Sequence, residues 1–167
     1  MRIEDFEGKG PTLDLESYFE GACEAWGLVE DRFGRLRRQF KVEIKGERLE
    51  TGIRLVEDFT YDDGQQESRT WVLTPLGGGR YEGRAEGVIG VARGRVCGSA
   101  FHWTYRLRLT IAGKDRIVAF DDWMFLQSDG VLINRARLSK FGVTLAEVTL
   151  VFRPKAPTES AITAAAA

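Results

Sequence analysis

Residues 101–111 read Phe-His-Trp-Thr-Tyr-Arg-Leu-Arg-Leu-Thr-Ile. Apolar or aromatic side chains occupy every odd-numbered position of this stretch, and polar side chains occupy every even-numbered one. Because successive side chains of a β-strand point to opposite faces, this alternation predicts a long strand with one buried face. Ala112-Gly113 follows it and is typical of a tight turn, so we expect the next strand to run back antiparallel.

The same period of two recurs through most of the chain. Turn sequences separate the alternating stretches, among them Asp62-Asp63-Gly64, Gly77-Gly78-Gly79 and Ser128-Asp129-Gly130. The pattern predicts roughly eight to ten long strands joined by hairpins. The clearest of the other strands are expected over 36–45, 49–61, 69–74, 117–127, 131–139 and 145–153.

This organisation predicts an all-β fold. An antiparallel up-and-down meander of this size removes its edges by closing into a lipocalin-like (calycin-type) β-barrel, which is wide enough for one small ligand. A two-sheet sandwich is the alternative, although its strands tend to be shorter. Only Asp14–Phe19 reads as a helix, short and capped by Asp14. Glycines at 83, 87, 90, 94 and 98 are expected to bend the chain.

The length of 167 residues predicts a single domain. We expect residues 1–11 to be a flexible lead-in, 12–154 to form the barrel, and 155–167 to be a disordered tail. The amino terminus has no apolar segment of the secretory kind, so we expect a cytoplasmic protein. No apolar run is long enough for a transmembrane helix.

Composition narrows the functions. A formal net charge of −1 argues against nucleic-acid binding, and one histidine with two cysteines is too few for a conventional zinc site. We therefore expect no metal and no cofactor. Cys23 and Cys97 are expected to be free thiols, with a disulfide between them as the alternative. The sequence gives no indication of the oligomeric state.

Aromatic residues are the first candidate ligand contacts. Such rings line hydrophobic pockets, and they also simply fill cores. Trp26 is further expected to act as a lid at one end of the barrel. The aromatic candidates are Trp26, Tyr61, Trp71, Trp103, Tyr105 and Trp123.

Polar residues on otherwise apolar strands are the second set. Asp121 and Asp122 are adjacent and must point to opposite faces of their strand, and so must Asn134 and Arg135. We take Asp121, Asn134 and Arg135 as candidates to orient the polar part of a ligand. The alternative is a structural salt bridge or hydrogen bond between neighbouring strands.

Three functions remain. The first is a binding protein for a small hydrophobic ligand. The second is an enzyme on a lipid-like substrate, with a cavity carboxylate or tyrosine as acid and base. The third is a packed accessory barrel without ligand. His102 is expected on the outer face, and no nucleophile with an adjacent base is evident, so we predict no catalytic residue and favour binding.

Five stretches follow one another along the chain: Leu13–Phe19, Glu24–Gly27, Phe59–Gly64, Phe120–Met124 and Ile133–Gly142. In that order they resemble the bacterial domain-of-unknown-function family 3833, over roughly residues 10–154. That family has no assigned activity. The resemblance implies an acyl-chain ligand, because relatives tend to lie beside genes for lipid modification. Many relatives look like lipoproteins with a lipidated cysteine before this region, and this chain has no cysteine there.

Overall fold

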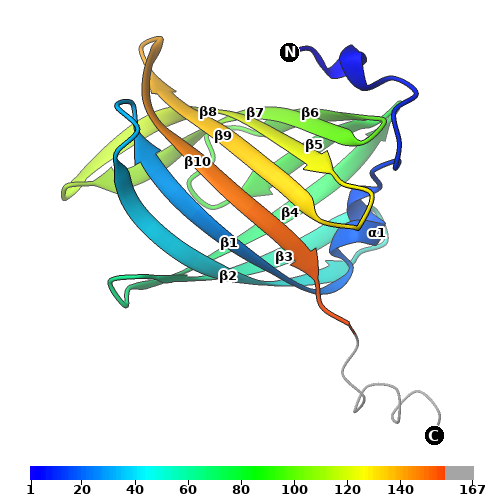
Figure 1. Ribbon diagram of the computed structural model, residues 1–167, viewed down its shortest axis with the longest axis horizontal. Helices are drawn as coiled ribbons and strands as arrows, with labels where there is room; N and C mark the ends of the chain where they lie inside the picture. Colours follow the sequence, from blue (N-terminus) through cyan, green and yellow to red (C-terminus); the bar gives the residue numbers. More distant parts are fainter. Residues whose placement is uncertain (157–167) are drawn as a thin grey trace, which may run out of the picture.

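The computed structural model describes residues 1–156 and forms a closed β-barrel of ten antiparallel strands (Figure 1). The expected tail from residue 157 onward lies outside the described residues. A one-turn 3-10 helix η1 and a short helix α1 precede the barrel. The elements are η1 (Ile3–Phe6), α1 (Leu15–Phe19), β1 (Gly21–Asp31), β2 (Leu36–Arg48), β3 (Ile53–Tyr61), β4 (Gln66–Gly77), β5 (Arg80–Ala85), β6 (Ala92–Cys97), β7 (Ala100–Ile111), β8 (Lys114–Leu126), β9 (Leu132–Lys140) and β10 (Val143–Pro154).

Each strand pairs with the strand that follows it in sequence, and the first strand pairs with the last. In that closing pair Trp26 lies opposite Val151. This confirms the predicted up-and-down barrel and excludes the sandwich, because every strand has two hydrogen-bonded neighbours and no edge remains.

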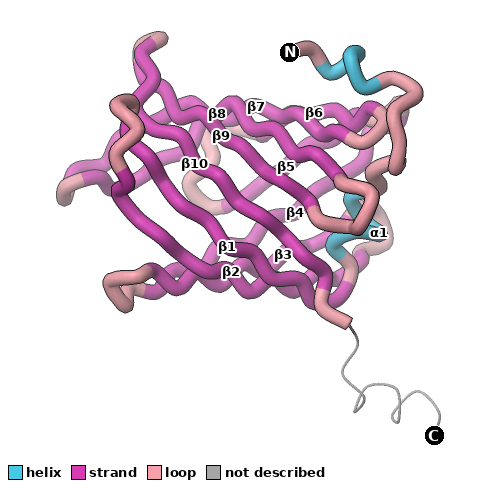
Figure 2. The backbone as a smooth tube through the Cα atoms, viewed as in Figure 1, coloured by secondary structure: helices cyan, strands magenta, loops and turns pink. Residues whose placement is uncertain are grey.

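The two ends of the barrel differ (Figure 2). At the closed end, α1 lies across the opening and buries Leu15 and Phe19 among the inward side chains. Asp14 caps this helix as predicted, because its side chain accepts a hydrogen bond from the Ser17 N–H at 2.9 Å. A Cβ at Gly46 would overlap the Phe19 carbonyl oxygen, so glycine at 46 lets the helix approach β2. The open end, at the left of Figure 1, carries the β1–β2, β3–β4, β7–β8 and β9–β10 hairpins and the β5–β6 connection.

Alternating residues of the strands point into the barrel and form one core. Gly94 faces inward on β6, where a side chain would collide with the Phe101 ring and the Trp103 Cβ of β7. Gly83 on β5 likewise leaves room for Trp103. These two glycines of the expected bending region therefore make space for aromatic rings.

One strand was not predicted from the sequence. Residues 21–31 form strand β1, which the sequence did not indicate because glycine, alanine and cysteine give it a weak alternation. The expected lead-in contains η1, and its Phe6 ring lies 5.6 Å from Phe125 and 6.2 Å from Trp123, on the outside of the barrel.

Cys23 and Cys97 are both free thiols. Cys23 is buried inside the barrel, and Cys97 is half-buried. Within the described residues, neither helix is long and apolar enough to cross a membrane.

Candidate functional site: a polar cluster inside the barrel

Strand β8 determines which of the two adjacent aspartates faces the interior. Asp122 is 5% exposed and lies inside the barrel with Met124, whereas Asp121 is on the outer face. Asp121 there lies 2.6 Å from the Nε2 of His102, which stacks on the Trp123 ring at 4.1 Å. The candidate Asp121 thus pairs with a neighbouring strand outside the barrel and does not reach its interior.

Three other sequence candidates also lie on the outer face. Trp26 is 44% exposed on β1 and does not act as a lid. Trp123 alternates with the inward Asp122 and therefore points outward. Arg135 is exposed on β9 and pairs with Glu147 at 3.6 Å. None of these side chains can contact a ligand held inside the barrel.

Asp121, Trp123 and Arg135 do meet in a groove of about 260 Å³ on the outer wall, beneath Met1. Its charged groups are already paired, because Asp121 binds His102 and Glu147 binds both Arg135 and Arg137. This groove therefore offers an incoming ligand few free polar partners.

Inside the barrel, Asp122 is the centre of a hydrogen-bonded cluster. The Asn134 amide donates to one Asp122 carboxyl oxygen, and the Tyr105 hydroxyl donates to the other at 3.3 Å. Asn134 also donates to the Trp123 carbonyl oxygen at 2.9 Å. The Trp103 indole N–H has no hydrogen-bond partner among the described residues, although it is close enough to lower the pKa of Asp122.

Burial dominates the electrostatics of this cluster. Loss of hydration raises the pKa of Asp122 to about 7, and the hydrogen bonds from Asn134 and Tyr105 offset only part of the rise. Burial also raises the pKa of the Tyr105 hydroxyl well above its usual value, and the charge of Asp122 adds to that rise. The tyrosine is therefore a neutral hydrogen-bonding group.

Glu57 of β3 is a second carboxyl inside the barrel. It follows the inward Leu55 and precedes the inward Phe59 in the alternation. Its pKa is raised to about 7, chiefly by burial; Arg69 opposes this rise and the charge of Asp122 adds to it. Both Glu57 and Tyr105 retain some accessible surface despite lying inside the wall, so the barrel interior beside them is reachable by solvent.

Aromatic rings surround this polar cluster. Trp71 lies 4.7 Å from Trp103 and 5.3 Å from Tyr105, and the Tyr105 ring stacks on Phe120 at 4.7 Å. Four of the predicted contacts, Trp71, Trp103, Tyr105 and Asn134, are thus brought together here.

Tyr61 also faces inward, but it lies nearer the open end, in a charged group. Its hydroxyl donates to Glu67 at 2.9 Å, and Glu67 pairs with Arg69 at 3.0 Å. The Arg38 guanidinium stacks on the Tyr61 ring at 3.4 Å and pairs with Asp63. Two arginines, each held by a carboxylate, therefore lie on the inner wall between the open end and Asp122.

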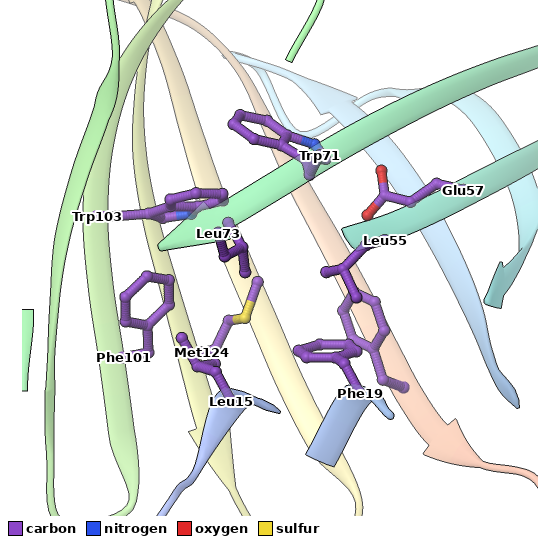
Figure 3. A pocket seen from close by; sticks show the side chains of 10 residues that line it. Leu15, Phe19, Leu55, Glu57, Trp71, Leu73, Phe101, Trp103 and Met124 are labelled. Atoms are coloured by element: carbon purple, nitrogen blue, oxygen red, sulfur yellow. The ribbon is translucent and has the colours of Figure 1, made fainter. Parts of the chain in front are cut away.

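Apolar side chains fill the closed half of the barrel. The enclosed cavity there measures only about 30 Å³, which is room for one or two water molecules. Figure 3 shows Leu15 and Phe19 rising into this space from α1, with Glu57 and Trp71 at its opposite edge. A ligand that meets the polar cluster must therefore occupy the open half, because the floor is already packed.

Sequence reasoning missed Glu57 and Arg69. Both signals were present: Glu57 lies two residues from Leu55 and from Phe59, and Arg69 lies two residues before Trp71. Each is a charged residue on the apolar face of an alternating strand, which marks an inward polar group. The described residues contain no cluster of three or more His, Cys, Asp or Glu side chains that could hold a metal ion.

The fold and this cluster define a class of protein: a closed up-and-down β-barrel with ionisable groups in its interior. A family model with the description "Protein of unknown function (DUF3833)" matches residues 1–154. The chain belongs to that family, as its sequence motifs predicted. No curated protein matches the chain.

Proposed function

We propose that the barrel binds a small fatty-acyl or other lipid-like molecule through its open end. The polar head would enter first and meet Asp122, Asn134 and Tyr105. The apolar part would lie nearer the open end, beside the stacked rings of Phe59 and Tyr61. The packed floor favours this orientation, because a hydrocarbon chain has no space beyond the polar cluster.

The observation on which this proposal depends is a pair of inward carboxyls beside a solvent-reachable interior. Burying a carboxyl opposes folding, and an apolar side chain of similar size would serve the core better. Glu57 and Asp122 are therefore better explained by contacts with a ligand than by stability. With pKa values of about 7, both can donate or accept a hydrogen bond near neutral pH.

The test begins with the protein as purified from cells. Native mass spectrometry is expected to detect a bound lipid-like molecule, and a fluorescent fatty acid is expected to bind and be displaced by fatty acids. An empty barrel together with no binding of the fluorescent fatty acid would refute the proposal and favour a packed accessory barrel.

Two variants locate the binding. Tyr105→Phe removes a hydroxyl from the polar cluster and keeps the ring, so affinity should fall about three- to ten-fold, as for one neutral hydrogen bond. Arg135→Ala is the matched control, because Arg135 lies on the outer face. Equal effects of both variants would contradict binding inside the barrel.

The same two carboxyls favour catalysis as a second candidate. At a pH near their shared pKa, one can be ionised and accept a proton from water while the other, protonated, donates to a leaving alcohol. Hydrolysis of a chromogenic acyl ester tests this. Activity that Glu57→Gln and Asp122→Asn each abolish, with the fold retained, would establish an enzyme, and no hydrolysis above buffer would exclude this substrate.

A further inference from the structure

Three neighbouring hairpins at the open end present apolar side chains to solvent. Phe141, in the β9–β10 hairpin, is 94% exposed, and Phe33, in the β1–β2 hairpin, is 68% exposed. We call the exposed apolar residues of these three hairpins the rim patch. Its members are Phe33, Leu36, Ile111, Phe141 and Val143.

The three hairpins are adjacent around the rim. Strand β1 pairs with β10, and β9 pairs with β8, so the β9–β10 hairpin lies between the β1–β2 and β7–β8 hairpins. A hydrogen bond from the Arg32 N–H to the Leu145 carbonyl oxygen, at 3.1 Å, links the first two. All three point away from the barrel in Figure 1, on the side opposite α1.

The conformation of Phe141 shows that the fold does not require a phenylalanine there. Its φ is +50°, and Gly142 follows with φ +75°, as in the tight hairpins that favour Asn-Gly. A bulky side chain in this region of φ is disfavoured by contact with its own backbone. An exposed phenylalanine at such a position gains nothing from packing, so its presence points to a role outside the folded core.

Cations flank both aromatic tips. The Arg32 and Arg35 guanidinium groups lie 4.7 Å and 5.9 Å from the centre of the Phe33 ring, and the Lys140 ammonium lies 5.3 Å from that of Phe141. Among the residues that the structure describes, none of these three cations forms a salt bridge. They therefore remain available to an anionic partner.

Two other connections lie at this end. The β5–β6 connection, residues 86–91, is held against β7 by the β-bridge between Val88 and Leu107, and its exposed large apolar side chain is Ile89, at 36% exposure. The β3–β4 hairpin differs from the three hairpins of the rim patch. It presents Asp62 and Asp63 before Gly64 and contributes no large exposed apolar side chain. The rim is thus divided into an apolar, cationic side and an acidic side, which gives the open end one preferred docking face.

We propose that the rim patch docks the open end of the barrel onto an anionic lipid bilayer. Aromatic side chains insert at the level of the headgroups, and flanking Arg and Lys pair with lipid phosphates. The protruding hairpin tips can insert into the headgroup region of a bilayer. A folded protein partner would instead need a continuous complementary surface. Docking rests on the rim patch alone, whereas entry of a ligand from the bilayer rests on the proposed function.

Flotation of the protein with vesicles tests the docking. Vesicles of equal parts phosphatidylcholine and phosphatidylglycerol are expected to bind the protein, and vesicles of phosphatidylcholine alone should bind it much more weakly. Neutralising Arg32, Arg35 and Lys140 together with glutamine should weaken binding to the anionic vesicles by about five-fold per charge. No binding to either vesicle, or equal binding to both, would overturn the proposal.

Phe141→Asn is the most informative single variant. Asparagine is favoured at this turn position, so the fold should be kept or stabilised while vesicle affinity falls about ten-fold or more. Leu76→Asn is the control, because Leu76 is 46% exposed beside the β4–β5 turn at the closed end. If Phe141→Asn binds vesicles as well as wild type does, the proposal is wrong.

Two further measurements separate the alternatives. Light scattering without lipid shows whether the rim patch mediates self-association. If wild type is a dimer, Phe141→Asn is a monomer and wild type does not bind vesicles, docking to a bilayer is overturned. Binding of the fluorescent fatty acid in solution should be unchanged in Phe141→Asn. If neither wild type nor any variant binds the fluorescent fatty acid, the proposed function is refuted, and vesicle docking is still decided by flotation.

Discussion

Replacing Asp122 with asparagine should make the barrel less sensitive to alkaline pH. The pKa of Asp122 is about 7 in the folded protein, whereas an unfolded aspartate has a pKa of about 3.9. Between these values the folded state binds more protons than the unfolded state, so the free energy of unfolding falls as the pH rises. The contribution of Asp122 to this free energy is fully present below about pH 4 and is lost above about pH 7.

The size of this effect follows from the pKa difference. Three pKa units correspond to about 4 kcal/mol, of which about 3 kcal/mol is lost between about pH 5 and about pH 9. An amide at position 122 resembles the protonated carboxyl, because it can still accept from Asn134 and can donate to the Tyr105 oxygen. Asp122→Asn should therefore gain about 3 kcal/mol relative to wild type on going from about pH 5 to about pH 9.

Urea denaturation followed by circular dichroism at the two pH values measures this directly. Glu57 titrates in both proteins, but its pKa is raised in part by the charge of Asp122, so the difference between the two proteins reports the aspartate together with its coupling to Glu57. Asp121→Asn is the matched control: its exposed pair with His102 should contribute less than about 1 kcal/mol at either pH. If wild type and Asp122→Asn lose the same stability between the two pH values, the inference that burial keeps this carboxyl neutral is wrong.

Three further perturbations test the closed end and the thiols. Gly46→Ala should destabilise the barrel by about 3 kcal/mol or more, because its Cβ would overlap the Phe19 carbonyl oxygen, and a wild-type urea midpoint would contradict the close approach of α1. Phe19→Ala should cost about 3 to 5 kcal/mol by enlarging the floor cavity, and a loss below about 1 kcal/mol would mean that the floor collapses around it. Iodoacetamide should alkylate half-buried Cys97 in the folded protein well before Cys23, whose burial raises its pKa to about 12, and mass spectrometry showing equal rates would contradict the burial of Cys23.

The barrel could be predicted from sequence because strand length, alternation and turn residues all indicate the same architecture. The orientation of individual strands was harder. On β8, odd positions include Trp123 and Phe125, and even positions include Phe120 and Met124, so both faces look apolar. Contact with Phe6 explains the apolar outer face, and that contact joins residues more than a hundred positions apart.

Because both faces of β8 look apolar, the sequence could not show which of two adjacent polar residues points into the barrel. Asn134 is inward and Arg135 outward, which alternation alone leaves open, and the same holds for Asp122 and Asp121. Glu57, in contrast, could be placed from the sequence, because only one face of β3 has a continuous apolar series. An ionisable residue within such a series deserves as much weight as an aromatic one.

Closure of the barrel by β1 and β10 has a consequence for how the protein folds. Trp26 and Val151 lie opposite each other although most of the chain separates them, so the last seam must wait until the final strand has been made. Contacts between residues so far apart in sequence slow folding. The entropy cost of closing the loop between them arises before the contacts form and offset it. Until then β1 and β9 are unpaired edges, at which a second nascent chain could pair. The pairing of β1 with β10 leaves the folded barrel without edges. A newly made chain is therefore most exposed to aggregation in the period before this pair forms.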